Sequence, residues 1–255
     1  MLIFHIMITI AILTKNSERT LKKTLESTKR FSEVILLDTG SKDATLEIAK
    51  NYKNVKIFFS DFDGFGNLRN KAASYASNDW ILALDSDEVI SEELFLELEK
   101  LKLETTICYE IPFINYYNNK QIKCCGWYPE SHVRLYNKKN TSFDDSYVHE
   151  SVIFKKNKIK KLKSYIYHTS YLCTDDFLHK MQLYTSLFAR QNKGKKKSSF
   201  AKAISHSIMA FIKSYILKKG FLGGKEGLVI SIYQANTSFY KYLKLYEVNQ
   251  EEKKL

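Results

Sequence analysis

The sequence predicts an α/β fold in which a Rossmann-like mixed sheet is followed by a helical C-terminal region. Strand-like and helix-like patterns alternate four times in the first hundred residues, which is typical of a parallel sheet with helices on both faces. Polar or acidic residues follow several of these apolar strands directly. After Asp175, apolar residues recur every three or four positions, which is the spacing of helices.

Four apolar runs are expected to form the parallel strands, and the first of them is rich in β-branched residues, as in a strand buried on both faces. The chain start is apolar but lacks a basic region and a cleavage site, so we expect a strand there and not a signal peptide. Capping residues such as Asn16 or Ser17, Ser41 and Ser91 can begin the intervening helices. The expected strands cover residues 6–14, 33–37, 55–59 and 80–84, and the expected helices 17–29, 41–52, 64–76 and the residues after 91.

The pattern changes after Leu103, where further strand-like segments are expected to extend the sheet in antiparallel or mixed fashion. We expect a catalytic domain over residues 1–172 and a basic, amphipathic helical region over residues 173–255. The later strands are expected at 105–117, 132–136 and 165–171, and the later helices from 175, over 200–219 and over 228–246.

The positive charge of the chain is concentrated in its last hundred residues. The formal net charge is +12, but residues 1–154 hold 19 basic and 22 acidic side chains, whereas residues 155–255 hold 21 and 6. A basic segment beside a near-neutral one indicates an appendage that binds an anion. The candidate anions are nucleic acid, a membrane surface and a phosphorylated substrate.

Carboxylates follow two of the expected parallel strands. Asp38 ends the second strand, and Asp85 and Asp87 follow the fourth, so together with Thr14 they should meet at one edge of the sheet. Two neighbouring carboxylates repel each other, and a divalent cation that also binds phosphate oxygens would relieve this. The alternative is that these residues form solvated turns that cap the following helices.

Several segments of the chain resemble family 2 glycosyltransferases of the GT-A, or nucleotide-diphospho-sugar transferase, fold. The segments 10–16, 37–45 and 80–88 carry the family resemblance in order and spacing. Six segments are similar to the branch of lipopolysaccharide core β-1,4-glucosyltransferases: 62–72, 79–88, 126–130, 134–136, 148–150 and 215–222.

The resemblance implies a binding site for a nucleotide sugar at the edge of the sheet. Asp38 would contact the nucleoside in a pocket lined by Thr14 and Asn16. Arg69 would face the diphosphate, and Asn70 belongs to the same nucleotide-sugar site.

The resemblance also implies a Mg²⁺ or Mn²⁺ cofactor. Asp85 would contact the ribose or the metal, and Asp87 would be a metal ligand. His149 and His168 are candidates for a third ligand or for a contact to the diphosphate, although His168 also fits a structural role.

Inverting transfer needs a general base that removes the proton of the acceptor hydroxyl. The segment 143–150 is similar to the part of the family in which this base lies, which favours Glu150, with Glu130 as the second candidate. The expected reaction is a single displacement without a covalent intermediate.

The resemblance thus implies an enzyme that moves a hexose, expected to be glucose from UDP-glucose, to a lipooligosaccharide or lipopolysaccharide core or a related glycan. We expect a cytoplasmic protein, peripheral on the inner face of the membrane, whose last helices dimerise, dock on the catalytic domain or contact anionic lipid. One alternative is a nucleic-acid-binding protein that uses the basic region. Another is a sugar nucleotidyltransferase, but residues 14–17 lack the glycine-rich loop typical of that class.

Overall fold

The structure is a computed structural model that describes residues 7–147, 150–153 and 158–251. The chain divides into two compact units. The first unit contains the residues up to 114 together with 131–169. The second contains residues 115–130 and the chain from 170 onward.

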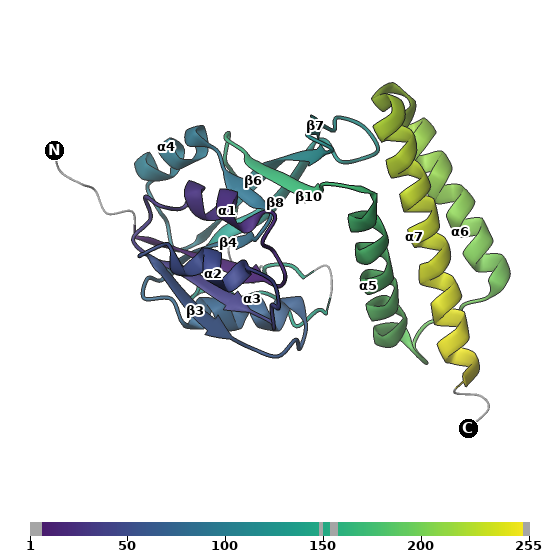
Figure 1. Cartoon of the computed structure of the whole chain (residues 1–255), viewed down its shortest axis with the longest axis horizontal. Coiled ribbons are helices and arrows are strands. Elements are labelled where there is room, and N and C mark those ends of the chain that lie inside the picture. The colour runs from purple at the N-terminus through teal and green to yellow at the C-terminus, as the bar shows by residue number, and fades with distance from the viewer. Residues whose placement is uncertain (1–6, 148–149, 154–157, 252–255) are drawn as a thin grey trace. The chain divides into compact units, whose positions relative to one another are not determined.

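The first unit is built on the predicted parallel strands, which are confirmed in number and order (Figure 1). They lie in the order β3-β2-β1-β4, and all three pairings are parallel. The strand order therefore reverses beside β1, where open α/β sheets hold their ligands. The strands are β1 (Ile8–Thr14), β2 (Val34–Asp38), β3 (Val55–Phe59) and β4 (Trp80–Asp85).

The sheet continues beyond β4 with mixed pairing, as expected. β8 pairs with β4 in antiparallel fashion, and the order continues β8-β6-β10-β5, with β7 and β9 paired to β6. The short β5, which directly follows the Asp85–Asp87 turn, was not predicted. The bounds are β5 (Glu88–Ile90), β6 (Ile107–Tyr117), β7 (Lys120–Gln121), β8 (Glu130–Asn137), β9 (Lys158–Lys161) and β10 (Ile166–Tyr171).

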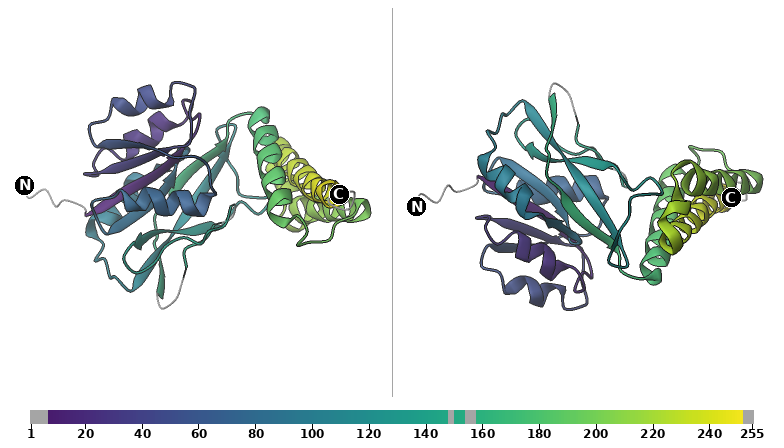
Figure 2. Two further views of the ribbon diagram at one scale, coloured as in Figure 1. Left: turned by 90° about the horizontal axis from the view of Figure 1, so that it is seen from below. Right: turned by 90° about the horizontal axis from the view of Figure 1, so that it is seen from above.

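Helices cover both faces of the parallel strands (Figure 2). Along β1, Ile10 and Ile12 pack in the core that includes α1, α2 and α4, whereas Ala11 and Leu13 pack in the core that includes α3. This follows from the period of two along a strand and explains why β1 is buried throughout. The helices are α1 (Leu21–Ser27), α2 (Thr45–Lys50), α3 (Phe65–Ser74) and α4 (Glu92–Lys100).

The second unit is mainly helical, and its three long helices lie side by side (Figure 2). They are α5 (Thr174–Asn192), α6 (Phe200–Ile212) and α7 (Gly224–Glu251). The helix expected over 200–219 ends as an α-helix at Ile212 and continues as the π-turn Lys213–Leu217, followed by the 3₁₀ turn Gly220–Gly223. Of the helices that the structure describes, none has the length and apolar content to cross a membrane.

Candidate active site

The polar strand ends meet at one edge of the sheet, as predicted. Thr14 lies opposite Asp38 in the register of β1 and β2, and Leu13 lies opposite Asp85 in the register of β1 and β4. This edge lies at the carboxyl ends of the strands where the strand order reverses. The topology therefore creates a candidate ligand site there.

Asp38 holds the turn that follows β2. Its side chain is buried and accepts hydrogen bonds from the backbone N–H groups of Gly40 and Ser41, both at 2.9 Å, and from the Ser41 hydroxyl. Gly40 has a φ of +95°, which a glycine adopts readily. The carboxylate thus stabilises the turn after β2 but does not cap the following helix, whose N-cap is Ala44, and the nucleoside contact stays a prediction.

Asn16 joins the loops after β1 and β2. Its backbone N–H donates to Ser41 Oγ at 2.8 Å, and its Oδ1 accepts the backbone N–H of Lys42 at 2.8 Å. Asn16 itself is exposed, whereas Thr14 is buried and its Oγ1 has no hydrogen-bond partner among the described residues. The two loops therefore form one surface, and the expected contact of both residues with the nucleoside stays a prediction.

Asp85 is held by two arginines. Nη2 of Arg69 lies 2.9 and 3.2 Å from its two carboxylate oxygens, and Nη2 of Arg134 lies 3.2 Å from Oδ2. Desolvation alone would raise the pKa of Asp85, but the charges of the two guanidinium groups outweigh this and lower the pKa to about 2. Asp85 is therefore ionised at neutral pH.

Arg134 also pairs with Glu88, and neither residue was predicted to have a role in the site. Arg134 Nη2 donates to Glu88 Oε1 at 2.7 Å, while Glu88 Oε2 accepts the backbone N–H of Asp85 at 2.9 Å. Glu88 is fully buried, and burial raises its pKa although Arg134 acts in the opposite direction. Both residues lie within segments that carry the resemblance, 80–88 and 134–136, and this was the only signal that could have identified them.

Glu150 forms an ion pair with Arg69. Oε1 of Glu150 accepts a 2.6 Å hydrogen bond from Arg69 Nε, so one guanidinium group contacts both Glu150 and Asp85. The side chain of Arg69 is 4% exposed and that of Glu150 12%. The favoured base candidate thus lies in the same network as the first aspartate of the acidic turn.

Asn70 forms hydrogen bonds with the backbone of Phe143, at the start of the segment that leads to Glu150. Its Nδ2 donates to the Phe143 carbonyl and its Oδ1 accepts the Phe143 N–H, both at 2.9 Å. The structure therefore shows Asn70 as a tether, and its part in binding the nucleotide sugar stays a prediction. The other base candidate, Glu130, belongs to the second unit, where Asn115 Nδ2 donates to it.

Asp87 lies beside His168, which is on β10. Nε2 of His168 is 3.5 Å from Oδ1 of Asp87, and the backbone N–H of Thr169 donates to the Asp87 carbonyl at 3.0 Å. The Asp87 carboxylate is the kind of oxygen ligand that Mg²⁺ and Mn²⁺ prefer when phosphate oxygens complete the site, whereas an imidazole nitrogen suits Mn²⁺ better than Mg²⁺. The described residues contain no group of three or more such ligands, and His149 lies outside the described residues.

Ser17 and Ser86 connect the acidic turn to the loop after β1. Their hydroxyl oxygens are 2.7 Å apart, and Thr24 Oγ1 donates to the Ser86 carbonyl at 3.0 Å. These contacts join residues more than sixty positions apart, which local sequence patterns do not reveal. They fix the backbone from which Asp85 and Asp87 project.

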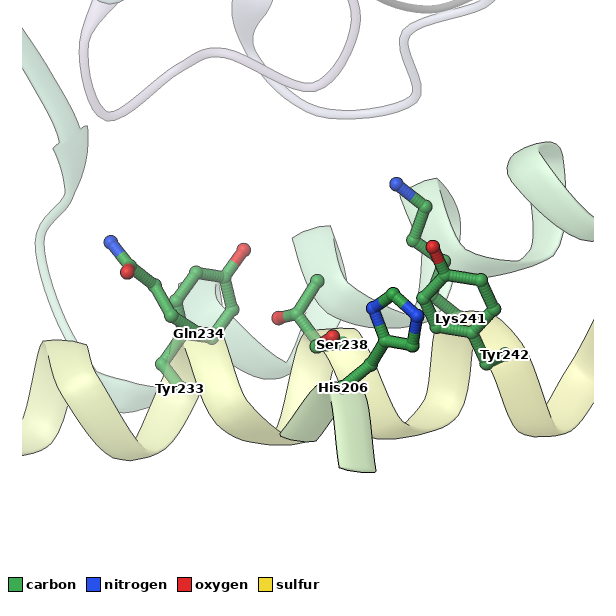
Figure 3. Close-up of a pocket in the computed structure, with 7 residues that line it drawn as sticks. His206, Tyr233, Gln234, Ser238, Lys241 and Tyr242 are labelled. Atoms are coloured by element: carbon green, nitrogen blue, oxygen red, sulfur yellow. The ribbon is translucent and has the colours of Figure 1, made fainter. Parts of the chain in front are cut away.

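A cavity of about 260 Å³ lies on the second unit between α6 and α7 (Figure 3). Its lining contains no carboxylate and none of the residues that were expected to bind the nucleotide sugar. Within it, burial and the nearby charge of Lys196 lower the pKa of Lys241. The lining residues are His206, Tyr233, Gln234, Thr237, Ser238, Lys241 and Tyr242.

Comparisons with known proteins identify relatives along most of the chain. The family model described as Glycosyl transferase family 2 matches residues 9–156. An uncharacterized glycosyltransferase of Rickettsia typhi is 32% identical over 253 residues, which covers 93% of this chain and 86% of the relative. The SPbeta prophage-derived glycosyltransferase SunS of Bacillus subtilis is 33% identical over 117 residues, covering 43% of this chain and 28% of that protein.

Solved structures give weaker likenesses. S. aureus TarS 1-349 in complex with UDP-GlcNAc is 16% identical, with a TM-score of 0.45 and coverage of 97% of this chain and 91% of that one. Glucosyl-3-phosphoglycerate synthase from Mycobacterium tuberculosis in complex with Mn²⁺, UDP and phosphoglyceric acid is 20% identical, with a TM-score of 0.33 and 43% coverage of both chains. Likenesses of this size say nothing about the donor or the acceptor of this chain.

Proposed function

Since the chain belongs to glycosyl transferase family 2 and has the GT-A fold, we propose that this glycosyltransferase moves a hexose from a UDP-sugar, expected to be UDP-glucose, with inversion. The observation that carries the proposal is the ion-pair network in which Arg69 contacts both Glu150 and Asp85 at the carboxyl end of β4. This network places Glu150, the base candidate, and the positively charged guanidinium of Arg69 beside the Asp85–Asp87 turn. Family membership also favours this activity over nucleic-acid binding and nucleotidyl transfer.

The reaction proposed is a single displacement. The acceptor oxygen forms a bond to the anomeric carbon while the bond from that carbon to the diphosphate oxygen breaks, and UDP leaves. Glu150 accepts the proton of the acceptor hydroxyl. Its ion pair with Arg69 orients the carboxylate, which supports Glu150 over Glu130 as the base.

Arg69 is the proposed contact to the diphosphate. Its Nη1 is buried and has no hydrogen-bond partner among the residues that the structure describes, so this donor remains for a phosphate oxygen. Burial alone would lower the pKa of Arg69, but Asp85 and Glu150 raise it above its ordinary value. The guanidinium therefore keeps its positive charge where negative charge develops in the reaction.

Asp87 and His168 are the residues that would hold Mg²⁺ or Mn²⁺. Asp85 is less suited as a ligand because both of its oxygens already contact arginine. A divalent cation bound there would stabilise the negative charge of the leaving diphosphate.

The acceptor is proposed to be a glycolipid or an oligosaccharide, such as a lipooligosaccharide or lipopolysaccharide core, at the inner face of the cytoplasmic membrane. The concentration of positive charge after residue 154 supports an anionic surface or a phosphorylated acceptor. This part of the proposal rests on the charge distribution and the resemblance of the later segments.

Release of UDP by the purified chain tests the proposed reaction. The protein is incubated with Mn²⁺, a panel of UDP-sugars and a lipooligosaccharide acceptor, and UDP is expected from UDP-glucose only when acceptor is present. Formation of UDP-sugar and pyrophosphate from UTP and a sugar 1-phosphate would instead identify a nucleotidyltransferase and overturn the proposal.

A further inference from the structure

α6 turns back into α7 through a short turn (Figure 1), and this turn carries exposed apolar and lysine side chains. We call residues 213–225, which form this turn, the helical tip. Leu217 and Leu222 are 67% and 70% exposed, and Ile216 and Phe221 are 55% and 51% exposed. The tip also carries four exposed lysines: Lys213, Lys218, Lys219 and Lys225.

Close backbone packing fixes the shape of the helical tip. A Cβ atom on Gly227 would lie 1.9 Å from the Gly220 carbonyl oxygen, so α7 approaches the 3₁₀ turn as closely as two glycines allow. The buried hydroxyl oxygens of Ser214 and Ser231 are 2.9 Å apart. The backbone N–H of Cys125 also donates to the Lys218 carbonyl at 2.9 Å. The apolar side chains are therefore exposed on a well-packed turn and not at a frayed end.

Further exposed apolar side chains lie along α6. Phe200, Ile204 and Ile208 follow one another at intervals of four residues, which places them on one face of the helix. They are 56%, 40% and 55% exposed. Exposed apolar side chains that share one helix face with others nearby often mark an interaction site.

The charge around this surface decides which partner fits it. No Asp or Glu occurs from Phe177 to Lys225, a stretch that contains ten lysines and one arginine. A second copy of the same face would bring like charges together, which disfavours self-association. An anionic lipid leaflet offers opposite charge at its surface and an apolar layer beneath it.

We propose that the helical tip docks the protein on an anionic lipid leaflet. Leu217, Leu222 and Phe221 enter the boundary between head groups and acyl chains, and the lysines contact lipid phosphates. This inference rests on the proposed function in one respect: docking would bring the enzyme to an acceptor that lies in the membrane.

Flotation of the full chain with vesicles tests the docking. The wild-type protein should float with vesicles of phosphatidylcholine and phosphatidylglycerol, and much less with phosphatidylcholine alone. The double variant Leu217→Ser/Leu222→Ser should partition about tenfold to a hundredfold more weakly, because two apolar side chains no longer enter the lipid. The matched control Leu178→Ser/Leu183→Ser removes two exposed leucines from α5 and should float as the wild type does.

A second variant tests the electrostatic part. Lys218→Gln/Lys225→Gln should weaken binding to the anionic vesicles by about tenfold at low salt and change little at high salt. Equal flotation of the wild type and the double leucine variant would overturn the proposal. A second result would also overturn the proposal. In it, no protein floats, the wild type sediments as a dimer, and the double leucine variant sediments as a monomer. A second copy of the chain would then cover the tip.

Flotation does not require the enzyme to turn over substrate. The proposed glycosyl transfer and the proposed membrane docking can therefore fail independently of each other. Protein that floats but releases no UDP contradicts the proposed function, and protein that releases UDP but does not float contradicts the docking.

Discussion

Arg69 and Glu150, which are 81 positions apart in the sequence, form an ion pair with 2.6 Å between Nε and Oε1. Both side chains are largely buried, and the same arginine contacts Asp85. A guanidinium that bridges two carboxylates offsets one of their two negative charges and can orient one of them for proton transfer.

Glu150→Gln should reduce kcat by about 100-fold to 10,000-fold, because glutamine keeps the shape of the side chain but cannot accept the acceptor's proton. UDP release measures the rate, and UDP binding should stay close to wild type. Glu130→Gln is the matched comparison, with a far smaller expected loss. If Glu130→Gln loses the activity and Glu150→Gln keeps it, the assignment of the base is wrong.

Gly66→Ala should reduce activity through the position of Glu150. A Cβ atom at this position would lie 1.8 Å from the Asp144 carbonyl oxygen, and the Gly66 N–H donates to the Ser146 carbonyl at 3.1 Å. The methyl group therefore pushes away the segment that carries Glu150, and a displacement of about 1 Å at a catalytic group can cost on the order of 100-fold in rate.

The exposed neighbour Asn67 provides the control for this substitution. Asn67→Ala should keep both its rate of UDP release and its melting temperature. A Gly66→Ala enzyme with wild-type kcat would show that this segment does not position the base.

The convergence of Thr14, Asp38 and Asp85 could be predicted from sequence, because apolar runs with intervening helices specify parallel strands whose carboxyl ends share an edge. The pairing of Arg134 with Asp85 and Glu88 could not. It depends on β8 lying antiparallel beside β4, a register that pairs residues 53 to 57 positions apart. Local periodicity contains no information on such a pairing.

The end of α6 shows a second limit of sequence patterns. Tyr215 and Ile216 continue the apolar spacing of α6, so the pattern predicts an unbroken helix to residue 219. The backbone instead widens into a π-turn after Ile212, and the close approach of Gly220 and Gly227 then reverses the chain. Tertiary packing therefore determines this turn and overrides the local helix propensity of the segment.

Arg134→Met should lower the free energy of unfolding by about 3 to 5 kcal/mol, because it leaves the buried Glu88 without its cation. The loss should be smaller at acidic pH. Burial raises the pKa of Glu88 even in the wild type, so the folded state binds a proton at Glu88 more readily than the unfolded state does. The contribution of Glu88 to stability therefore falls as the pH rises. Urea unfolding at two pH values measures both effects.

Two further variants make this measurement specific. Adding Glu88→Gln to Arg134→Met should restore part of the stability, because the buried charge is removed. Lys139→Met breaks an ion pair with Asp79 in which the two side chains are 71% and 41% exposed, and should cost less than about 1 kcal/mol. Equal losses for Arg134→Met and Lys139→Met would contradict the role of the buried pair.

Asp87→Asn and His168→Gln should each weaken Mn²⁺ binding in the presence of UDP by about tenfold or more, since each removes or weakens a ligand. Titration calorimetry measures the affinity directly. Asp79→Asn, which changes an exposed carboxylate at the other end of β4, should bind Mn²⁺ as the wild type does. Unchanged affinity in both site variants would place the metal elsewhere.

Glu33 should make the stability of the first unit depend on acidic pH. Its buried carboxylate accepts hydrogen bonds from Thr9 Oγ1 at 2.6 Å and from Lys56 Nζ, Ser77 N–H and Ser77 Oγ at 2.7 Å. Burial alone would raise the pKa of Glu33, but these donors outweigh it and lower the pKa from 4.5 to about 2.

A lowered pKa means that the ionised form stabilises the fold. The contribution is complete above pH 4.5 and is lost as the pH falls towards 2, at a cost of about 2 to 3 kcal/mol. Glu33→Gln should therefore be less stable than the wild type at neutral pH, and the difference should shrink between pH 5 and pH 2. Glu99→Gln, an exposed change on α4, should follow the wild-type curve in the same unfolding series. If the curves of Glu33→Gln and wild type stay parallel over this range, the hydrogen bonds to Glu33 do not select its ionised form.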